Sequence, residues 1–271
     1  MFQSIKQTKI YREIIQYRDE RITHAQFSCK YAESLRKLKN IHSGERCFLI
    51  GNGPSLQPAD LDRLQNEKAF ASNYIYRMYA HTLWRPTYYL NSDLGVLKNM
   101  KDEAAFWNSE AQKCFFQYNS RFVLNDDYPD NSICFYLREA EKYWKKPKFS
   151  HDVGNEVFDA STVTYIMFQL ACYMGFREIY LLGIDHNYST TINLNGVVNK
   201  HTVKDHFYSS NKNSDFDGGA TANLQRMELG YLAAKEYAKK HGIKIYNATR
   251  GGKLEIFDRI CFDDIFVAKE V

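Results

Sequence analysis

Several short apolar runs in this sequence end in side chains that could bind a ligand or move a proton. The polar residues at these ends are Asn52, Asn73, Asn91 with Asp93, Asp185 with His186, and Asn247 with Thr249. Each asparagine carboxamide offers a hydrogen-bond donor and an acceptor, which suits the recognition of an uncharged base or ribose. Because ligands of open parallel sheets bind beyond the carboxyl ends of the strands, the pattern predicts a nucleotide-type ligand.

A glycine-rich turn follows the first of these runs. The apolar residues Cys47–Ile50 are succeeded by Gly51, Asn52, Gly53, Pro54 and Ser55. Glycine lets the backbone turn tightly and leaves its amide groups uncovered, and Ser55 could cap a following helix. A helix start with free amides attracts phosphate. We therefore interpret Gly51–Ser55 as part of a nucleotide site.

Apolar runs and helical patterns alternate along the chain and predict the elements that position these residues. Strand patterns occupy residues 69–76, 86–93, 132–137, 178–185 and 243–249, and helical patterns occupy residues 160–176 and 223–242. This alternation is typical of a parallel sheet covered on both faces. We expect an α/β fold: a single Rossmann-like domain over residues 45–271, with a central, mostly parallel sheet flanked by helices.

Residues 1–44 differ from the rest and predict an N-terminal helical arm. Isoleucines at roughly helical spacing indicate a helix through Asn40. Up to that residue, nine Lys and Arg stand against four Asp and Glu. The arm could be a solvated helix packed on the body, or a basic surface that rests on anionic lipid or on a partner subunit.

The composition of the chain narrows the class of protein. Its 271 residues carry a net charge of +4, which is too mild to argue for a nucleic-acid partner. No apolar run approaches the roughly 20 residues that span a bilayer, and the first residues lack the apolar stretch of a signal peptide. We therefore expect a cytoplasmic protein, with the basic arm able to touch the inner membrane face. The six cysteines include no CxxC pair, so no zinc site is expected.

Four stretches together resemble a known family. They are "LIGNGPSL", an Asn-bearing strand, "YYLNSDL" and "ACYMGFREIYLLGIDHNY". They are similar to the bacterial sialyltransferases of glycosyltransferase family 42 and to the wider group called domain of unknown function 115. The closing "IYNATRGGKLEIFDR" resembles the wider group most. The resemblance covers roughly residues 45–260, without the middle at about 100–155 and without residues 190–200, and it implies a GT-A-like fold.

The resemblance implies roles for individual residues. In the sialyltransferases three asparagines hold a CMP-sugar without a metal motif, and here Asn52, Asn73 and Asn91 take those places. Ser161 and Thr162 stand beside the positions of a donor-contacting pair. Tyr188, displaced by one residue, would assist the departing phosphate, and His206 in "VKDHFYSS" would be the general base. With these residues we group Gly51, Gly53, Ser55, Asp93 and Asp185 as nucleotide-binding.

The chemistry of glycosyl transfer independently favours a histidine base. A base must take the proton of the acceptor hydroxyl, and histidine titrates near neutral pH. The polar, glycine-containing segment after His206, residues 208–220, could close over bound donor. His186 and His201 are the remaining candidates for this base.

The donor sugar and the metal requirement are open at this stage. The arginine that precedes the donor-contacting pair of the sialyltransferases is missing, because Phe158, Asp159 and Ala160 precede Ser161. Lys204, Arg250 or Lys253 could replace it, and the sugar could be sialic acid, Kdo or a neutral sugar. The acidic pairs in residues 125–127 and 262–264 could hold Mg²⁺ beside a diphosphate. Such pairs are more often solvated, so we assign no metal ligand and no required cofactor.

Three functions follow from these observations. The first is an inverting glycosyltransferase that moves a CMP-activated sugar to a glycan or lipid-linked oligosaccharide, in bacterial surface polysaccharide, lipooligosaccharide or glycoprotein synthesis. The second is a 6-hydroxymethylpterin pyrophosphokinase that needs ATP and Mg²⁺. The third is a non-catalytic nucleotide-binding module. Related sialyltransferases form oligomers, so the resemblance makes a homo-oligomer one option, and the residues themselves leave the oligomeric state open.

Overall fold

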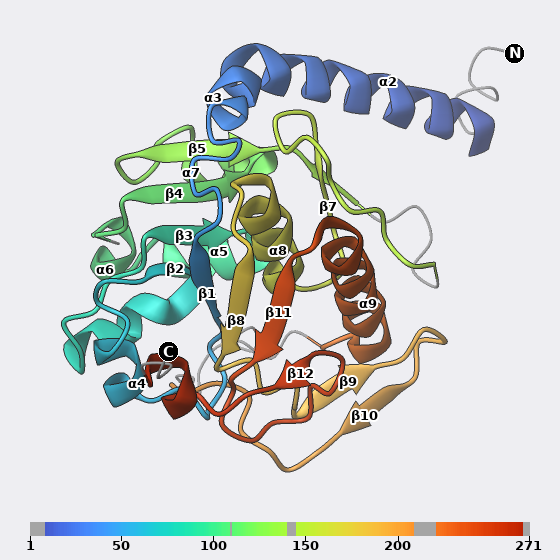
Figure 1. Cartoon of the computed structure of the whole chain (residues 1–271). Coiled ribbons are helices and arrows are strands. Elements are labelled where there is room, and N and C mark those ends of the chain that lie inside the picture. The colour runs from blue at the N-terminus through green and yellow to red at the C-terminus, as the bar shows by residue number, and fades with distance from the viewer. Residues whose placement is uncertain (1–8, 109, 140–144, 209–220, 268–271) are drawn as a thin grey trace, which may run out of the picture.

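A parallel eight-stranded sheet forms the centre of the protein (Figure 1). The computed structural model describes residues 9–108, 110–139, 145–208 and 221–267. The strand order is β12-β11-β8-β1-β2-β3-β4-β5, and every neighbouring pair is parallel. The strands are β1 (Arg46–Ile50), β2 (Lys68–Ser72), β3 (Tyr88–Asn91), β4 (Lys113–Gln117), β5 (Ser132–Phe135), β8 (Glu178–Leu182), β11 (Lys244–Asn247) and β12 (Asp258–Arg259). The predicted α/β, Rossmann-like fold is therefore confirmed.

Helices and two small ladders complete the described structure. The helices are α2 (Lys9–Phe27), α3 (Glu33–Arg36), α4 (Pro58–Asp62), α5 (Leu94–Met100), α6 (Ala104–Trp107), α7 (Arg121–Leu124), α8 (Val163–Tyr173) and α9 (Leu224–His241). A π-helical turn, Ser28–Ala32, joins α2 to α3, and 3-10 helices span Asn73–Ala80, Tyr118–Ser120 and Asp263–Phe266. Strands β9 (Thr190–Ile192) and β10 (Val198–Lys200) pair antiparallel, and β6 (Leu137–Arg138) pairs parallel with β7 (Val157–Phe158). None of the described helices is long and apolar enough to span a bilayer.

The central strand β1 shows why its sequence forms a buried strand. Cys47, Phe48, Leu49 and Ile50 are all fully buried although their side chains alternate between the two faces. A continuous apolar run of this kind is what a parallel strand covered on both faces requires. On one face, the Phe48 ring packs near Phe262 and Phe266 of the C-terminal segment.

The two long helices of the core have ends that the sequence encodes. Thr162 caps α8 by accepting from Thr164 N–H (3.3 Å), and Asn223 caps α9 by accepting from Arg226 N–H (3.0 Å). Helix α9 ends at Gly242, whose φ of +66° is the left-handed conformation that glycine tolerates best. The predicted helices over 160–176 and 223–242 are thus present with shorter bounds.

The arm helix α2 lies across the β5 end of the sheet and extends beyond it (Figure 1). Its last residue, Phe27, is fully buried, as is Leu35 of α3. His24 Nε2 lies 2.9 Å from the carbonyl oxygen of Asn155, and Arg36 pairs with Asp152 (3.1 Å). The C-terminal part of the arm is therefore packed into the core of the sheet domain.

One strand prediction needs correction, and one strand of the central sheet was missed between predicted strands. The run 69–76 is strand only to Ser72, because Asn73 adopts a left-handed φ of +52° and a 3-10 helix follows. Buried Tyr74, Ile75 and Tyr76 gave that 3-10 helix the apolar appearance of a strand. Strand β4 (Lys113–Gln117) was not predicted at all.

Candidate functional site

The order in which the chain adds strands reverses between β1 and β8, and the glycine-rich turn lies at this position. Chain order runs outward from β1 through β5 on one side and through β8, β11 and β12 on the other. Gly51 N–H donates to the carbonyl of Leu182 (2.8 Å), and Gly53 N–H donates to that of Gly183 (2.9 Å). The turn is therefore bonded to the segment after β8 at the topological switch point, where open α/β sheets bind ligands.

Both glycines of the turn are required by close contact. A Cβ on Gly51 would lie 2.3 Å from the Gly183 carbonyl oxygen, and one on Gly53 would lie 1.8 Å from Asp185 Oδ2. Neither distance is compatible with a side chain. The glycines thus let the turn approach Asp185 directly.

Ser55, at the other end of the turn, also contacts Asp185. Its Oγ–H donates to Asp185 Oδ2 (2.7 Å). Burial raises the pKa of the Asp185 carboxyl, and the bond from Ser55 opposes that rise. The expectation that Ser55 caps a helix is wrong, because α4 starts at Pro58 after Gln57 and the Ser55 hydroxyl is bonded to Asp185.

The three predicted asparagines are connected by hydrogen bonds at the ends of β1, β2 and β3. Asn91 Nδ2 donates to Asn73 Oδ1 (3.1 Å), and Asn52 Nδ2 donates to the carbonyl of Ser72 (3.0 Å), the residue before Asn73. The left-handed backbone of Asn73 turns its carbonyl to the Tyr89 hydroxyl, which donates to it (3.0 Å). The structure therefore brings Asn52, Asn73 and Asn91 together.

Two carboxamide oxygens of this cluster carry no hydrogen bond. Asn52 Oδ1 and Asn91 Oδ1 are both buried and have no hydrogen-bond partner among the described residues. Asn91 as a whole is fully buried. A buried acceptor left unpaired costs about 1–3 kcal/mol, so two of them in this cluster mark a place where the protein tolerates a stability loss.

A segment far along the chain covers this cluster. We call Lys204–Tyr208 the covering segment. Phe207 N–H donates to the main-chain carbonyl of Asn52 (2.9 Å), and the Tyr208 ring packs on Tyr74, with centroids 5.2 Å apart. The Arg77 guanidinium lies over both rings, 4.2 Å from that of Tyr74 and 5.0 Å from that of Tyr208.

The covering segment carries the predicted base. The His206 ring stacks on Tyr208 with centroids 5.0 Å apart and an interplanar angle of 12°. His206 thus lies one residue from the contact with Asn52. The segment 208–220 that was expected to close over the donor lies, apart from Tyr208, outside the described residues.

Tyr188 lies on the β8 side of the site. Its hydroxyl pKa is raised well above the usual value by burial and by the nearby Tyr231, Asp205 and Asp185. The hydroxyl therefore stays protonated and able to donate. Asp205 accepts from both the backbone N–H and the hydroxyl of Ser189 (Oγ to Oδ2, 2.7 Å), which ties the covering segment to the chain just after Tyr188.

Ser161 and Thr162 form the turn before α8. Ser161 has a left-handed φ of +56°, and its N–H donates to Asp159 Oδ1 (3.0 Å). Burial raises the pKa of Asp159, opposed by the Ser161 N–H and by Arg226. Arg226 is 1% exposed and donates to the carbonyl of Asp159 (3.0 Å). Asp159 is thus tied to the turn by its bonds with Ser161 and Arg226.

Three predicted polar residues have structural partners. Asp93 Oδ1 accepts from Gly95 N–H (2.7 Å) and from Val96 N–H as the N-cap of α5. Asn247 Nδ2 donates to the carbonyl of Leu254 (2.8 Å), and Asn247 Oδ1 accepts from Thr249 N–H. These contacts account for the polar side chains after β3 and β11 without a ligand.

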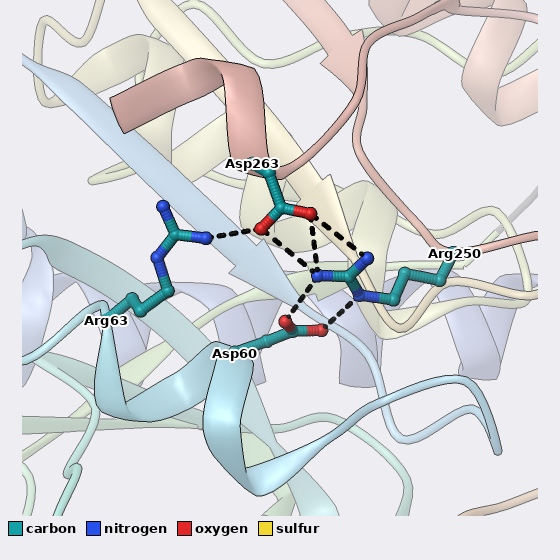
Figure 2. A network of polar contacts seen from close by, with 4 residues as sticks. All are labelled: Asp60, Arg63, Arg250 and Asp263. Atoms are coloured by element: carbon teal, nitrogen blue, oxygen red, sulfur yellow. Dashed lines mark hydrogen bonds and ion pairs between the residues drawn. The ribbon is translucent and has the colours of Figure 1, made fainter. Parts of the chain in front are cut away.

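Arg250, considered above as a partner for an acidic sugar, belongs to an ion-pair network instead (Figure 2). Its Nε and Nη2 each lie 2.8 Å from one carboxylate oxygen of Asp60, and Nη2 lies 3.4 Å from Asp263. Arg63 also pairs with Asp263. Asp263, from one of the acidic pairs considered for Mg²⁺, therefore bonds two arginines.

The loop that follows Arg250 reaches the site through its backbone. Lys253 N–H donates to the carbonyl of Asp185 (2.7 Å), and a Cβ on Gly252 would lie 2.8 Å from the same oxygen. Lys204 Nζ donates to the carbonyl of Phe207 (3.0 Å). No group of three or more His, Cys, Asp or Glu side chains with metal-site spacing occurs within the described ranges.

The described residues also enclose a cavity of about 440 Å³. It is lined by the loop 148–158, which contacts α3 through Asp152 and the end of α9 through His151, whose ring lies 6.3 Å from that of His241. None of the predicted site residues lines it.

Sequence reasoning missed four residues of the site. Phe207, Tyr74 and Arg77 hold the covering segment, and Glu228 of α9 lies 3.3 Å from His186 Nε2. These contacts join residues more than 40 positions apart or depend on ring packing. Only the aromatic pair Phe207-Tyr208 after His206 gave a local signal.

Comparison with known proteins places the chain in a family. Residues 21–191 match the family model described as "MptE-like: 6-hydroxymethylpterin diphosphokinase MptE-like". No curated protein matches. Among solved structures, the MAf glycosyltransferase from Magnetospirillum magneticum AMB-1 is similar, with 14% identity and a TM-score of 0.51 over 89% of this chain. The match spans only 38% of that protein, and at this identity the likeness concerns the fold alone.

Proposed function

The chain belongs to the MptE-like family, and we propose that it is an inverting glycosyltransferase that uses a CMP-activated sugar. The observation that carries the proposal is the linked asparagine cluster with its two buried, unpartnered carboxamide oxygens. Amide groups recognise the uncharged edges of a base and the hydroxyls of a ribose. The cluster stands beside the switch point of the sheet, where a nucleotide would bind.

In this proposal the base and ribose bind at Asn52, Asn73 and Asn91, and the phosphate lies toward the turn Gly51–Ser55. His206 takes the proton of the acceptor hydroxyl. The acceptor oxygen then forms the new bond to the anomeric carbon, the bond from that carbon to the phosphate oxygen breaks, and its electron pair leaves with CMP. Tyr188 donates a hydrogen bond to the departing phosphate. The transferred sugar, whether sialic acid, Kdo or a neutral sugar, would be selected by residues on the β8 side.

The wider assignments are part of the same proposal. The acceptor is a glycan or a lipid-linked oligosaccharide of a bacterial surface polymer or glycoprotein. The protein works in the cytoplasm, where its basic arm can contact the anionic inner membrane face, and it forms a homo-oligomer. No cofactor besides the donor is required.

The first experiment is a thermal-shift screen of the purified protein with CMP, CDP, UDP, GDP, ADP and ATP, each with and without Mg²⁺. A ligand that binds only the folded state raises the melting temperature. A shift with CMP that is independent of metal is the expected result. A shift that requires ATP and Mg²⁺ would instead favour the diphosphokinase activity for which the family is named.

The base assignment is tested by His206→Ala, with exposed His81→Ala as the matched control. We expect His206→Ala to lose transfer to acceptor while it keeps the CMP-induced thermal shift, because the imidazole acts on the acceptor and not on the nucleotide. Retained turnover would remove His206 from the mechanism, and His201→Ala would then test the other histidine of the same region.

A further inference from the structure

His186, directly after Asp185, combines three features that are unusual for a residue that only fills space in the core. The residue is 6% exposed. Its backbone adopts a left-handed φ of +51°, which a β-carbon makes unfavourable. Its Nδ1 is buried and has no hydrogen-bond partner among the described residues. Strained backbone and unpaired buried polar atoms concentrate at functional sites.

The other ring nitrogen fixes the state of this histidine. Nε2 lies 3.3 Å from Glu228 Oε1 on α9, so Nε2 carries the proton and donates to the carboxylate. Burial lowers the pKa of the His186 imidazole, and the neighbouring Glu228 opposes this shift only in part. The lowered pKa keeps the ring neutral near pH 7. Nδ1 is then a lone-pair acceptor that lacks a donor.

The position of the ring relates this acceptor to the donor site. Its edge contacts are Tyr188, at a centroid distance of 6.4 Å, and Tyr231, at 5.7 Å. The side chains of Thr162 and Thr164, at the start of α8, oppose the rise that burial causes in the pKa of Tyr231, so Tyr231 lies next to them. His186 is thus packed between the proposed phosphate-assisting tyrosine and the Ser161–Thr162 turn, on the opposite side of β1 from the asparagine cluster.

We propose that His186, oriented by Glu228, binds a hydroxyl group of the sugar nucleotide through Nδ1. The inference rests on the proposed donor site and adds to it a residue that recognises the ligand on the β8 side. A hydroxyl group supplies the hydrogen-bond donor that Nδ1 lacks. Because the imidazole is neutral, it can accept this hydrogen bond without interacting strongly with the charge of the phosphate. Ribose and the transferred sugar both carry such hydroxyls.

Two substitutions distinguish the roles of the two ring nitrogens of His186. His186→Asn keeps a polar acceptor near the place of Nδ1 and suits a left-handed φ, since asparagine adopts it readily. His186→Gln keeps an amide near the place of Nε2, facing Glu228, and removes the acceptor at Nδ1. The melting temperature of each free protein reports folding, and isothermal titration calorimetry gives the affinities for CMP, CMP-N-acetylneuraminic acid and CMP-Kdo.

The expected result is an affinity about tenfold lower for His186→Gln, as one buried hydrogen bond would give, with His186→Asn close to wild type. If His186→Gln already binds CMP more weakly than wild type does, His186 binds a ribose hydroxyl. If the variant binds CMP normally but binds the CMP-sugars more weakly, His186 binds a hydroxyl of the transferred sugar. Glu228→Gln, which keeps an acceptor for Nε2–H without changing His186, should bind within about threefold of wild type.

Other outcomes overturn the inference in distinguishable ways. Equal affinities for wild type and His186→Gln would make His186 a packing residue and leave the donor site intact. Equal losses in both His186 variants would show that the acceptor at Nδ1 is not what matters. If wild type binds UDP, GDP or ADP instead of CMP, the cytidine assignment fails and the same comparison is made with that nucleotide. If it binds none, both proposals fail.

Discussion

Arg250 is expected to stabilise the fold by pairing with the buried carboxylate of Asp60. The Asp60 side chain is 4% exposed and Arg250 is 36% exposed. Two bonds of 2.8 Å join the guanidinium to both carboxylate oxygens (Figure 2). Replacing Arg250 by Met would keep much of the aliphatic volume and leave the Asp60 charge without its cation.

The size of the effect follows from the burial of the two partners. Removing one partner of a fully buried pair costs about 3–5 kcal/mol. Because Arg250 is one-third exposed and water can reach its place, we expect the lower end, about 3 kcal/mol for Arg250→Met. In a chain of this length that corresponds to a fall in melting temperature of about 5 °C. Asp263→Asn, whose side chain is 53% exposed, should cost under about 1 kcal/mol.

Urea denaturation followed by circular dichroism measures these free energies, with the slope m as a check that the transition is unchanged. Asp60→Asn should cost less than Arg250→Met, because it removes the buried charge, and the double variant should recover part of the loss. A cost below about 1 kcal/mol for Arg250→Met would refute the reasoning. So would a double variant whose loss is simply the sum of the two single losses.

Three further predictions concern the site itself. Gly53→Ala should abolish the CMP-induced thermal shift, because its Cβ would lie 1.8 Å from Asp185 Oδ2; an unchanged shift would mean that the turn does not contact the ligand. Asn91→Leu should change the melting temperature little, because it removes an unpaired buried acceptor together with the bond to Asn73, while CMP binding is lost; retained binding would contradict the role of the cluster. Asp185→Asn should be at least as stable as wild type at pH 7. The folded pKa of Asp185 is raised by burial, so wild type loses stability as the pH rises from about 4 through that value, and the gap should close in acid, as pH-dependent denaturation would show.

The architecture could be predicted because its signals are local. The run Cys47–Ile50 and the capped helices α8 and α9 each carry their pattern within a few residues. Strand β4 was missed although Cys114, Phe115 and Phe116 are all fully buried, since a three-residue apolar run gives no periodicity to distinguish it from a helix segment. The wrong strand assignment at 73–76 also comes from a short apolar run. Such a run indicates that its residues are buried, but it does not show whether their backbone is extended or helical.

The site could be predicted only in part, because hydrogen-bond partners are not visible in a sequence. All five strand ends looked equivalent, yet Asn247 and Asp93 bond to their own loops while Asn52 and Asn91 keep an unpaired oxygen. His186 is a similar case. Its left-handed backbone and its pairing with Glu228, 42 positions away, arise from tertiary packing.

The hydrogen bonds made by the polar side chains near the carboxyl ends of the strands favour a particular kind of ligand. The carboxylates here are already bonded: Asp185 to Ser55, Asp205 to Ser189, and Asp60 to Arg250. Among the described residues at or just after the ends of β1, β3 and β8, the buried atoms without a hydrogen-bond partner include the carboxamide oxygens of Asn52 and Asn91 and Nδ1 of His186. Neutral acceptors of this kind match amino and hydroxyl groups, which a nucleoside and a sugar both present. A phosphoryl transfer would bring a cation to carboxylates that already accept hydrogen bonds, whereas recognition of a sugar nucleotide would complete the hydrogen bonds that the fold leaves open.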